Sequence, residues 1–509
     1  MLRFLTALTL ILLAAAPANA EWRRAVSPHF IVYSEGPPEE IREFTETLER
    51  FDALLKLMSP IAAEESPVPL TVFVVSQGSR IASLVGNAFV LGFYEAEMEG
   101  PMAVVPRRMR GEMSAEEVLF HEYAHHFMLK NYSTSYPGWF VEGYAELFST
   151  TSFERNGSIR LGLPPAHRRH ELWDRDAIPI RTLLLGSPRD VANYGSFSFY
   201  AQSWFITHYL TFDQEREGQL ARYLALIGSG RPAQEAAVET FGDLETLERD
   251  FERYRRARSL PIITIRPENL PPLPQIRVES LPRGEQALVW HKLRYMRGVR
   301  PADVADFAQE VRAIAAAMPS EPAALQMLAD AEYLAENFDA ADRAVDALLA
   351  IRPDAPRALL RKGLIAIRRL ETAENSEPDR WTEARRWIVR ANRAAPDDPL
   401  ILYRYYASFA RQRIRPPDAA RLGLARAFQL MPQVAELRMN LALSLVSERR
   451  YNEAEPLLAS LAYAPHASPL RQAALEMLEK VQPLEDGAPM PAGEAQGSEV
   501  AAPVDGDAE

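Results

Sequence analysis

The order of apolar and polar positions divides the chain into a mixed first half and an almost wholly helical second half. Between residues 23 and 258, short β-branched apolar runs alternate with segments whose apolar positions recur at helical spacing. The runs predict strands at 29–33, 69–75, 89–94 and 102–105. The helical spacing predicts helices at 38–57, 114–130, 139–150, 199–212 and 244–258. Together these elements predict an α+β domain.

The second half repeats a helical unit whose end is marked by proline. The punctuating residues are Pro319, Pro353, Pro396, Pro432 and Pro465, at intervals of 34, 43, 36 and 33 residues. A helix–turn–helix unit of about 34 residues with a proline near its end is typical of tetratricopeptide repeats. Small residues and an aromatic recur where two such helices cross, at Ala329, Phe338 and Ala341, at Gly363, Trp381 and Ala384, and at Ala442, Tyr451 and Ala454. An unrelated helical bundle is the alternative, but the regular punctuation favours an all-α tetratricopeptide-like solenoid.

Three further segments complete the predicted organisation. Residues 1–20 combine Arg3, an apolar run and Ala18-Asn19-Ala20, the pattern of a cleaved secretory signal peptide. Residues 259–284 contain six prolines and predict an extended, proline-rich linker, and residues 484–509 carry seven acidic and no basic residues and predict a disordered acidic tail. The remaining segments are the α+β domain (21–258) and the helical-repeat domain (285–483).

Export and composition narrow the chemistry that is open to the chain. Because the chain has no Cys, it forms no disulfide, and histidines and carboxylates must hold any metal. A signal peptide, the absence of Cys and abundant Ala and Arg favour a secreted protein of a Gram-negative periplasm. The net charge of −12 argues against nucleic acid as the main partner. The apolar run near the start is short for an uncleaved anchor, which needs about 20 residues, and no later segment predicts a stable membrane span.

The predicted helix at 114–130 contains His121-Glu122-Tyr123-Ala124-His125, an HExxH motif. Histidines four residues apart lie on one face of a helix, one turn apart, where both can bind one Zn²⁺. Glu122 lies beside the first ligand, so its carboxylate can reach a metal-bound water and act as general base. A solvated helix with a histidine pair is the alternative, but the motif is flanked by apolar residues. His126 points about 100° away from His125, its neighbour in the helix, and is predicted to be no ligand but a group beside the ligands or on the surface.

Two histidines do not hold zinc tightly, so a third protein ligand is expected. Glu142 and Glu146 are four residues apart on the predicted helix at 139–150. The sixteen residues between His125 and Glu142 suffice for a turn and a second, antiparallel helix, so Glu142 can complete a His₂Glu site. Glu146, one turn further, could hydrogen-bond a zinc-binding histidine without binding the metal itself. The alternative is that both carboxylates lie on the surface of their helix.

The sequences HEYAHH (121–126) and WFVEGYAE (139–146) resemble the gluzincin zinc metallopeptidases, the clan that includes thermolysin. The chain is most similar to bacterial peptidase MA-like domains, in which Pro-x-Trp-x-x-Glu-Gly-x-Ala-Glu follows HExxH. The resemblance covers residues 22–258 and implies a zinc peptidase domain built from a small mixed sheet and active-site helices. It implies that His121, His125 and Glu142 bind Zn²⁺ and that Glu122 is the catalytic base. It also implies a sheet edge that receives extended substrate, here at 89–94.

A peptidase also needs a donor to the oxyanion that forms when water attacks a carbonyl. The segment that begins Ser198-Phe-Tyr200 resembles the corresponding helix of peptidase MA-like domains, which makes Tyr200 the candidate, with Tyr194 and His208 as alternatives. Tyr200 could equally be a core aromatic. The Gly-x-Met-Glu-Asn segment of related aminopeptidases is missing, so endopeptidase activity stays open.

Two functions are compatible with these features. The first is an exported zinc peptidase that cleaves a peptide or protein substrate and whose helical repeats recruit that substrate or a protein partner. The second is an interaction or scaffold protein whose zinc site is structural or catalytically silent. The intact motif favours the first.

Overall fold

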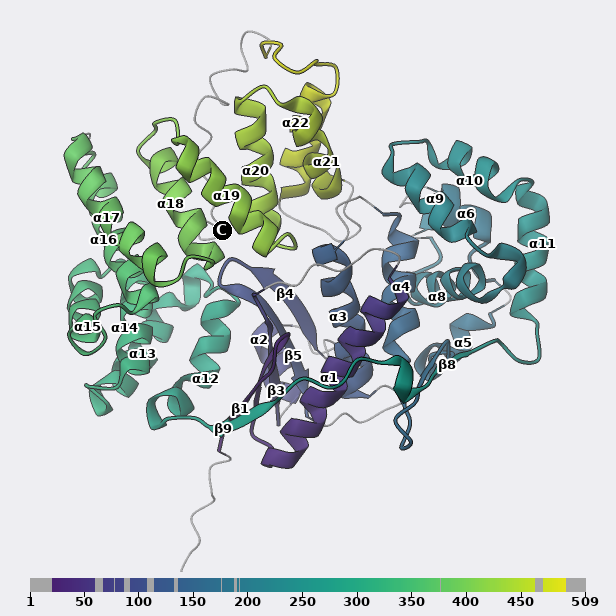
Figure 1. Ribbon diagram of the computed structural model, residues 1–509, viewed down its shortest axis with the longest axis horizontal. Coiled ribbons are helices and arrows are strands. Elements are labelled where there is room, and N and C mark those ends of the chain that lie inside the picture. Colours follow the sequence, from purple (N-terminus) through teal and green to yellow (C-terminus); the bar gives the residue numbers. More distant parts are fainter. Residues whose placement is uncertain are drawn as a thin grey trace, which may run out of the picture.

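The computed structural model describes residues 21–59, 67–76, 78–86, 92–107, 114–131, 136–174, 176–186, 190–191, 193–375, 377–462 and 470–490. The predicted signal peptide and residues 491–509 of the predicted tail lie outside these ranges. The described part is mixed α+β followed by a long run of helices, as predicted (Figure 1). No helix in the described ranges is both long enough and apolar enough to cross a membrane.

A six-stranded mixed sheet lies at the centre of the molecule, with the strand order β4-β5-β3-β2-β1-β9. Its strands are β1 (Arg23–Val26), β2 (Phe30–Ser34), β3 (Leu70–Val75), β4 (Phe93–Glu97), β5 (Gly100–Pro106) and β9 (Arg277–Ser280). β2 and β5 run parallel to β3, and the other neighbours are antiparallel. The edge strand predicted at 89–94 is found instead at 93–97, and residues 87–91 lie outside the described ranges.

Both faces of this sheet are covered by helices. Side chains of a strand alternate between the two faces, so Val32 and Val72 pack with α1 (Pro38–Met58) and α3 (Ala115–Asn131). Their neighbours Tyr33 and Phe73 pack on the opposite face with α2 (Gly78–Val85) and α12 (Arg283–Met296). Burial on both faces explains why β3 is apolar at every position except Thr71.

The proline-rich segment at 259–284 is extended, but it does more than link two domains. Strand β8 (Ile263–Ile265) joins β6 (Ser152–Phe153) and β7 (Ile159–Leu161) in a small antiparallel sheet. Strand β9 pairs with β1 at one edge of the large sheet. Both strands lie between the prolines, where backbone N–H groups are present and must find acceptors. The segment and α12 therefore belong to the fold of the first half.

The remaining helices of the first half gather beside α3, at the right of Figure 1. They are α4 (Gly138–Ser149), α5 (Arg169–Leu172), α6 (Ile180–Leu185), α8 (Ser196–Phe212), α9 (Gln219–Gly228), α10 (Ala233–Phe241) and α11 (Leu244–Arg255). Helix α4 lies between α3 and α8 and packs closely against both. These three helices carry the site described below.

The second half is an array of antiparallel helix pairs, here called the helical array. Its helices are α13 (Val304–Ala317), α14 (Pro322–Leu334), α15 (Phe338–Ile351), α16 (Pro356–Thr372), α17 (Pro378–Ala394), α18 (Pro399–Arg411), α19 (Asp418–Leu430), α20 (Ala435–Ser447), α21 (Tyr451–Ala462) and α22 (Leu470–Val481). The small residues predicted at helix crossings are buried there, as at Ala329, Ala341 and Ala454. The C-terminal half is therefore a helical-repeat region.

The predicted acidic tail begins in ordered structure rather than in a disordered segment. The hydroxyl of Tyr451 donates to the carbonyl of Ala488 at 2.7 Å, and the N–H of Gly487 donates to the carbonyl of Arg449 at 2.9 Å. Leu484 and Met490 pack against the last helices. The apolar residues in this stretch let residues 484–490 cap the array, which the count of acidic residues alone did not reveal.

Candidate metal centre

Helix α3 begins with a reciprocal capping box. The hydroxyl of Ser114 accepts from the N–H of Glu117 at 3.0 Å, and the Glu117 carboxylate accepts from the N–H of Ser114 at 2.5 Å. The helix is then held by aromatic packing on α1, where Phe120 stacks on Phe51 at 4.3 Å between ring centroids. These contacts fix the rotation of α3 and turn the side chains of His121 and His125 toward α4.

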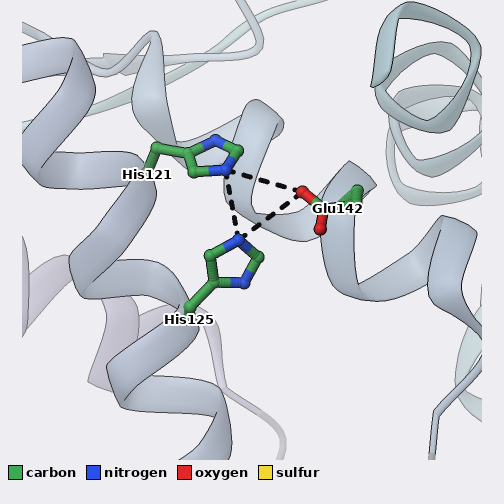
Figure 2. A group of neighbouring side chains, drawn as sticks. All are labelled: His121, His125 and Glu142. Atoms are coloured by element: carbon green, nitrogen blue, oxygen red, sulfur yellow. Dashed lines mark hydrogen bonds and ion pairs between the residues drawn. The ribbon is translucent and has the colours of Figure 1, made fainter. Parts of the chain in front are cut away.

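Helix α4 is set against α8 by a close crossing at Gly143. A Cβ atom at this position would lie 2.1 Å from Oγ1 of Thr207 and 2.2 Å from the carbonyl oxygen of Ser203. No side chain fits in that space, so the helices approach as closely as their backbones allow. The crossing places the preceding residue, Glu142, opposite the two histidines of α3 (Figure 2).

Three potential ligand atoms converge at this point. Nε2 of His121 lies 3.1 Å from Nε2 of His125, and each nitrogen lies 3.5 Å from Oε2 of Glu142 (Figure 2). Atoms held at tetrahedral angles about 2.0–2.2 Å from a zinc ion are separated by about 3.3–3.5 Å. At tetrahedral angles, the observed separations of 3.1, 3.5 and 3.5 Å correspond to zinc–ligand bonds of about 1.9–2.1 Å. The donor set and its spacing therefore fit zinc.

The electrostatics of the three residues also suit a cation. Glu142 keeps 3% exposure, and a carboxylate buried this deeply needs a positive partner. Burial alone would raise the pKa of Glu142, but hydrogen bonds and charges from His121 and His125 hold it well below its ordinary value. Burial alone would lower the pKa of His121, but Glu142 and the nearby carboxylates of Glu146 and Glu122 raise it to about 9. The site is thus an acidic environment in which a positive charge is favourable.

A second group of histidine and carboxylates, His29, Glu49 and Asp52, lies behind α3 and differs in one respect. Nζ of Lys56 lies 3.0 Å from Oδ2 of Asp52 and 2.9 Å from Nε2 of His29, so a cation of the chain itself balances the carboxylates. The Tyr123 hydroxyl donates to Asp52 at 2.7 Å. This cluster fastens α1 to α3 and needs no metal.

Glu122, the predicted base, is held between α3 and the sheet edge. Burial raises its pKa, while the charges of His121 and His125 and a hydrogen bond from the backbone N–H of Tyr94 act in the opposite direction. The carboxylate therefore lies beside the ligands and is oriented by strand β4.

Glu146, predicted to support a histidine ligand, has a closer partner. Its Oε1 lies 3.9 Å from Nδ1 of His121, which exceeds a hydrogen bond, but 2.7 Å from Nη2 of Arg168. Arg168 belongs to the short helix η1 (Ala166–Arg168), and its neighbour His167 lies 3.7 Å from the other oxygen of Glu146. Glu146 thus links η1 to the histidine side of the site.

Of the three candidate oxyanion donors, the structure brings Tyr200 to the site. Its ring centroid lies 6.4 Å from that of His121, and the Arg168 guanidinium lies 4.8 Å above its ring. Burial and the nearby carboxylates of Glu142 and Glu146 raise the pKa of Tyr200 to about 12 against the charge of Arg168, so its hydroxyl keeps its proton. His208 is buried elsewhere, between the Gly162 carbonyl and the Tyr254 hydroxyl, and Tyr194 is exposed in the turn before α8.

Three residues near the site escaped the sequence analysis or were placed differently. His126, expected beside the ligands or on the surface, is buried, and its Nδ1 hydrogen-bonds the Tyr94 hydroxyl at 2.9 Å. Tyr94 itself, which contacts both His126 and Glu122, fell in a predicted strand without a predicted role. Arg168 belongs to the basic run HRRH (167–170), which stands out in an acidic chain. The distance in sequence between this run and HExxH gives no indication that the two meet in the fold.

Comparison with known proteins adds little to this geometry. No protein-family model matches the chain, and no curated protein matches it. Among solved structures, a thermophilic TPR protein of Thermus thermophilus is similar, with 20% sequence identity and a TM-score of 0.33. The similarity covers 38% of this chain and 99% of that one. It says nothing about the metal centre or about an activity.

Proposed function

We propose that the chain is an exported, zinc-dependent peptidase of the periplasm. One observation carries the proposal: His121, His125 and Glu142 hold three ligand atoms 3.1–3.5 Å apart, with the Glu122 carboxylate beside them. Zinc bound there would lower the pKa of a bound water to about 7 and polarise a carbonyl oxygen. The location in the periplasm rests on the signal pattern of residues 1–20 and the absence of Cys.

The residues of the chain then divide the work of hydrolysis. Glu122 takes the proton of the attacking water and passes it to the leaving amine. The Tyr200 hydroxyl, kept protonated, donates to the oxyanion of the attacked carbonyl. Arg168 stacks on the ring of Tyr200 and forms an ion pair with Glu146, so it positions one residue of α8 and one of α4.

Strand β4 supports a peptide as the substrate. It is the terminal strand of the sheet, and Glu97 and Gly100 flank a two-residue turn. Residues that flank such a turn form a hydrogen-bonded pair, so the backbone groups of Tyr94 and Ala96 point away from β5. The N–H of Tyr94 donates to Glu122, so an extended peptide could pair with the Tyr94 carbonyl and with Ala96 while its scissile bond lies near Glu122.

The test is the substitution Glu122→Gln in the mature chain. We expect zinc to remain bound and cleavage of a peptide library, read by mass spectrometry, to fall by about 10²–10⁴-fold, because a general base contributes that much. Glu116→Gln is the matched control, since Glu116 is exposed in the first turn of the same helix. Equal cleavage by wild type and Glu122→Gln would refute the mechanism.

Metal removal gives an independent prediction. A chelator should abolish cleavage and lower the melting temperature, because a ligand that binds only the folded state stabilises it. Glu142→Gln should weaken zinc binding more strongly than Glu146→Gln, because it removes a charged ligand. Glu146→Gln should weaken it by about tenfold at most, the low end of the usual effect of an outer residue, because its carboxylate lies 3.9 Å from Nδ1 of His121 and does not hydrogen-bond it. Competition titration with a zinc indicator measures both. Equal zinc affinity in wild type and Glu142→Gln would exclude Glu142 as a ligand.

A second candidate, an interaction protein with a catalytically silent zinc site, is supported by the helical array, whose helices run from Val304 to Val481. Both candidates bind zinc, so metal content does not separate them. Stoichiometric zinc together with no chelator-sensitive cleavage of any peptide would favour this second function.

A further inference from the structure

The turn that joins β4 to β5 is enclosed by the helical array. Met98 in this turn keeps 6% exposure and belongs to an apolar cluster with residues of the five array helices α16 to α20, among them Leu359, Tyr403 and Leu437. The neighbouring Glu99 accepts from Nη1 of Arg357 at 3.0 Å and from the Tyr295 hydroxyl at 3.2 Å. Figure 1 shows β4 and β5 reaching from the sheet to these helices.

The partners of Glu99 are themselves fixed. Nε of Arg357 lies 3.2 Å from Oδ2 of Asp398, at the start of α18. The Tyr295 hydroxyl accepts from Arg361 at 2.7 Å, and Arg361 also donates to Asp330 of α14 at 2.8 Å. Glu99 is therefore tied to α12, α14, α16 and α18 through one connected network, in which Arg361 and Asp330 are buried and Arg357 is partly exposed. Such a network resists displacement because leaving any member buried without its partner is costly.

The other end of the same strand contacts the site. The hydroxyl of Tyr94, five residues before Glu99, lies 2.9 Å from Nδ1 of His126, and its backbone N–H donates to the Glu122 carboxylate. At about 3.3–3.4 Å per residue, about 17 Å of strand separates the two positions. Because the turn between β4 and β5 has two residues, the register of the hairpin is fixed and movement of its tip displaces Tyr94.

We propose that the helical array positions Glu122 through this hairpin. The array holds Glu99 and Met98, the rigid hairpin holds Tyr94, and Tyr94 orients the Glu122 carboxylate and keeps the backbone edge of β4 in place. Glu99 and Arg357 are positioning residues that act on the site from a distance. The array thus serves the site of its own chain, besides any partner that it recruits. This inference rests on the proposed function only for its activity readout.

The experiment compares four variants of the full mature chain loaded with zinc. Glu99→Ala removes both hydrogen bonds that Glu99 accepts, and Arg357→Ala removes one of them. Arg357→Lys keeps a cation at the position of Arg357. Arg369→Ala is the matched control, because Arg369 lies on the same helix and forms ion pairs only with Asp339 and Asp342 among the described residues. Circular dichroism and zinc content establish that each variant is folded and loaded.

Two readouts are measured on each variant. Amide hydrogen exchange over residues 93–97 should become about tenfold faster in Glu99→Ala and Arg357→Ala, while exchange over β2 and β3 stays as in wild type. In the same variants kcat for peptide cleavage should fall about tenfold with zinc content unchanged. Arg357→Lys should recover most of both effects, and Arg369→Ala should show neither.

The outcomes separate this inference from the proposed function. Unchanged exchange over residues 93–97 in both alanine variants overturns the inference, whatever the activity. Faster exchange with an unchanged kcat also overturns it, since the hairpin would then not position Glu122. Exchange that rises across the whole sheet overturns it as a general loss of stability. If wild type cleaves no peptide, the proposed function fails. The change in amide exchange over residues 93–97 then tests by itself whether the helical array keeps β4 in place.

Discussion

Gly143 sets the distance between the helix that carries Glu142 and the helix that carries Tyr200. A methyl group at this position would meet Thr207 and Ser203 at little more than 2 Å, and one of its neighbours is backbone that cannot turn aside. We expect Gly143→Ala to destabilise the protein by about 3 kcal/mol, at the upper end of the usual cost of overpacking. Urea unfolding measures the loss, and zinc titration should show weaker binding, because pushing α4 away from α8 displaces Glu142 relative to the two histidines of α3.

The chain supplies its own control for this substitution. Gly423 lies inside α19, and a Cβ there would meet its nearest atom at 3.7 Å, an ordinary contact. Because Ala favours a helix over Gly, Gly423→Ala should stabilise the protein by about 0.5–1 kcal/mol. If Gly143→Ala destabilises the protein while Gly423→Ala stabilises it, the close helix crossing at Gly143, and not the loss of a glycine as such, causes the destabilisation. A Gly143→Ala variant as stable as wild type would refute the tight crossing.

Residues close in sequence and residues far apart differ in how well the candidate site could be predicted. Helix geometry places His121, Glu122 and His125 on adjoining positions, so their grouping follows from spacing alone. Glu142 required one further assumption, an antiparallel second helix, which the structure contains. Arg168 could not be predicted, because its contacts with Glu146 and Tyr200 depend on how η1, α4 and α8 meet in space.

At the scale of single elements, the pairs of the helical array share one turn. Glu336, Glu374, Arg413 and Arg449 each follow the first helix of a pair and have a left-handed backbone, with φ between 47° and 60°. At each turn the next N–H donates to the carbonyl five residues back, as from Ile414 to Phe409 at 3.1 Å. This is the Schellman motif, in which glycine is the usual residue because it bears no Cβ penalty. The array therefore has four strained turns that glycine would relax.

Arg413 allows this strain to be measured, because its side chain is exposed. We expect Arg413→Gly to stabilise the array by about 0.5–1 kcal/mol, since relief of the left-handed strain outweighs the added freedom of the unfolded chain. Arg413→Ala keeps a Cβ and should bring no gain. Thermal unfolding of the three proteins compares them, and an alanine variant as stable as the glycine variant would exclude backbone strain as the cause.

At the scale of the molecule, the sequence predicted the elements better than the boundary between its two halves. Hydrophobic period identified β2, β3 and β5 and the repeating helices, because each signal lies within a few residues, but it did not identify β1 or β9. The segment at 259–284 was interpreted as a linker because its prolines dominate its composition, whereas β9 and α12 complete a sheet that begins more than 250 residues earlier. Strand pairing over that distance leaves no local periodic signal, so the proline content of the segment could not reveal that it also contributes a strand to the large sheet.

This shared core yields a prediction about fragments of the chain. A fragment of residues 21–258 lacks Leu281, Val289 and Leu293, which cover Tyr33 and Phe73 on one face of the sheet. Each large apolar side chain contributes about 1.5–3 kcal/mol when buried, and a domain is stable by only about 5–15 kcal/mol in total. Losing the cover of several such side chains removes most of that margin and exposes an apolar patch.

We therefore expect residues 21–258 to aggregate or to bind a hydrophobic dye, and residues 21–298, which keep β9 and α12, to be a folded monomer. Gel filtration and near-ultraviolet circular dichroism compare the two fragments. The longer fragment should bind zinc, because all three ligand residues and their helices are present, but its β4–β5 hairpin lacks the array that holds Glu99. A shorter fragment that folds and binds zinc as well as the longer one would restore the boundary at residue 258.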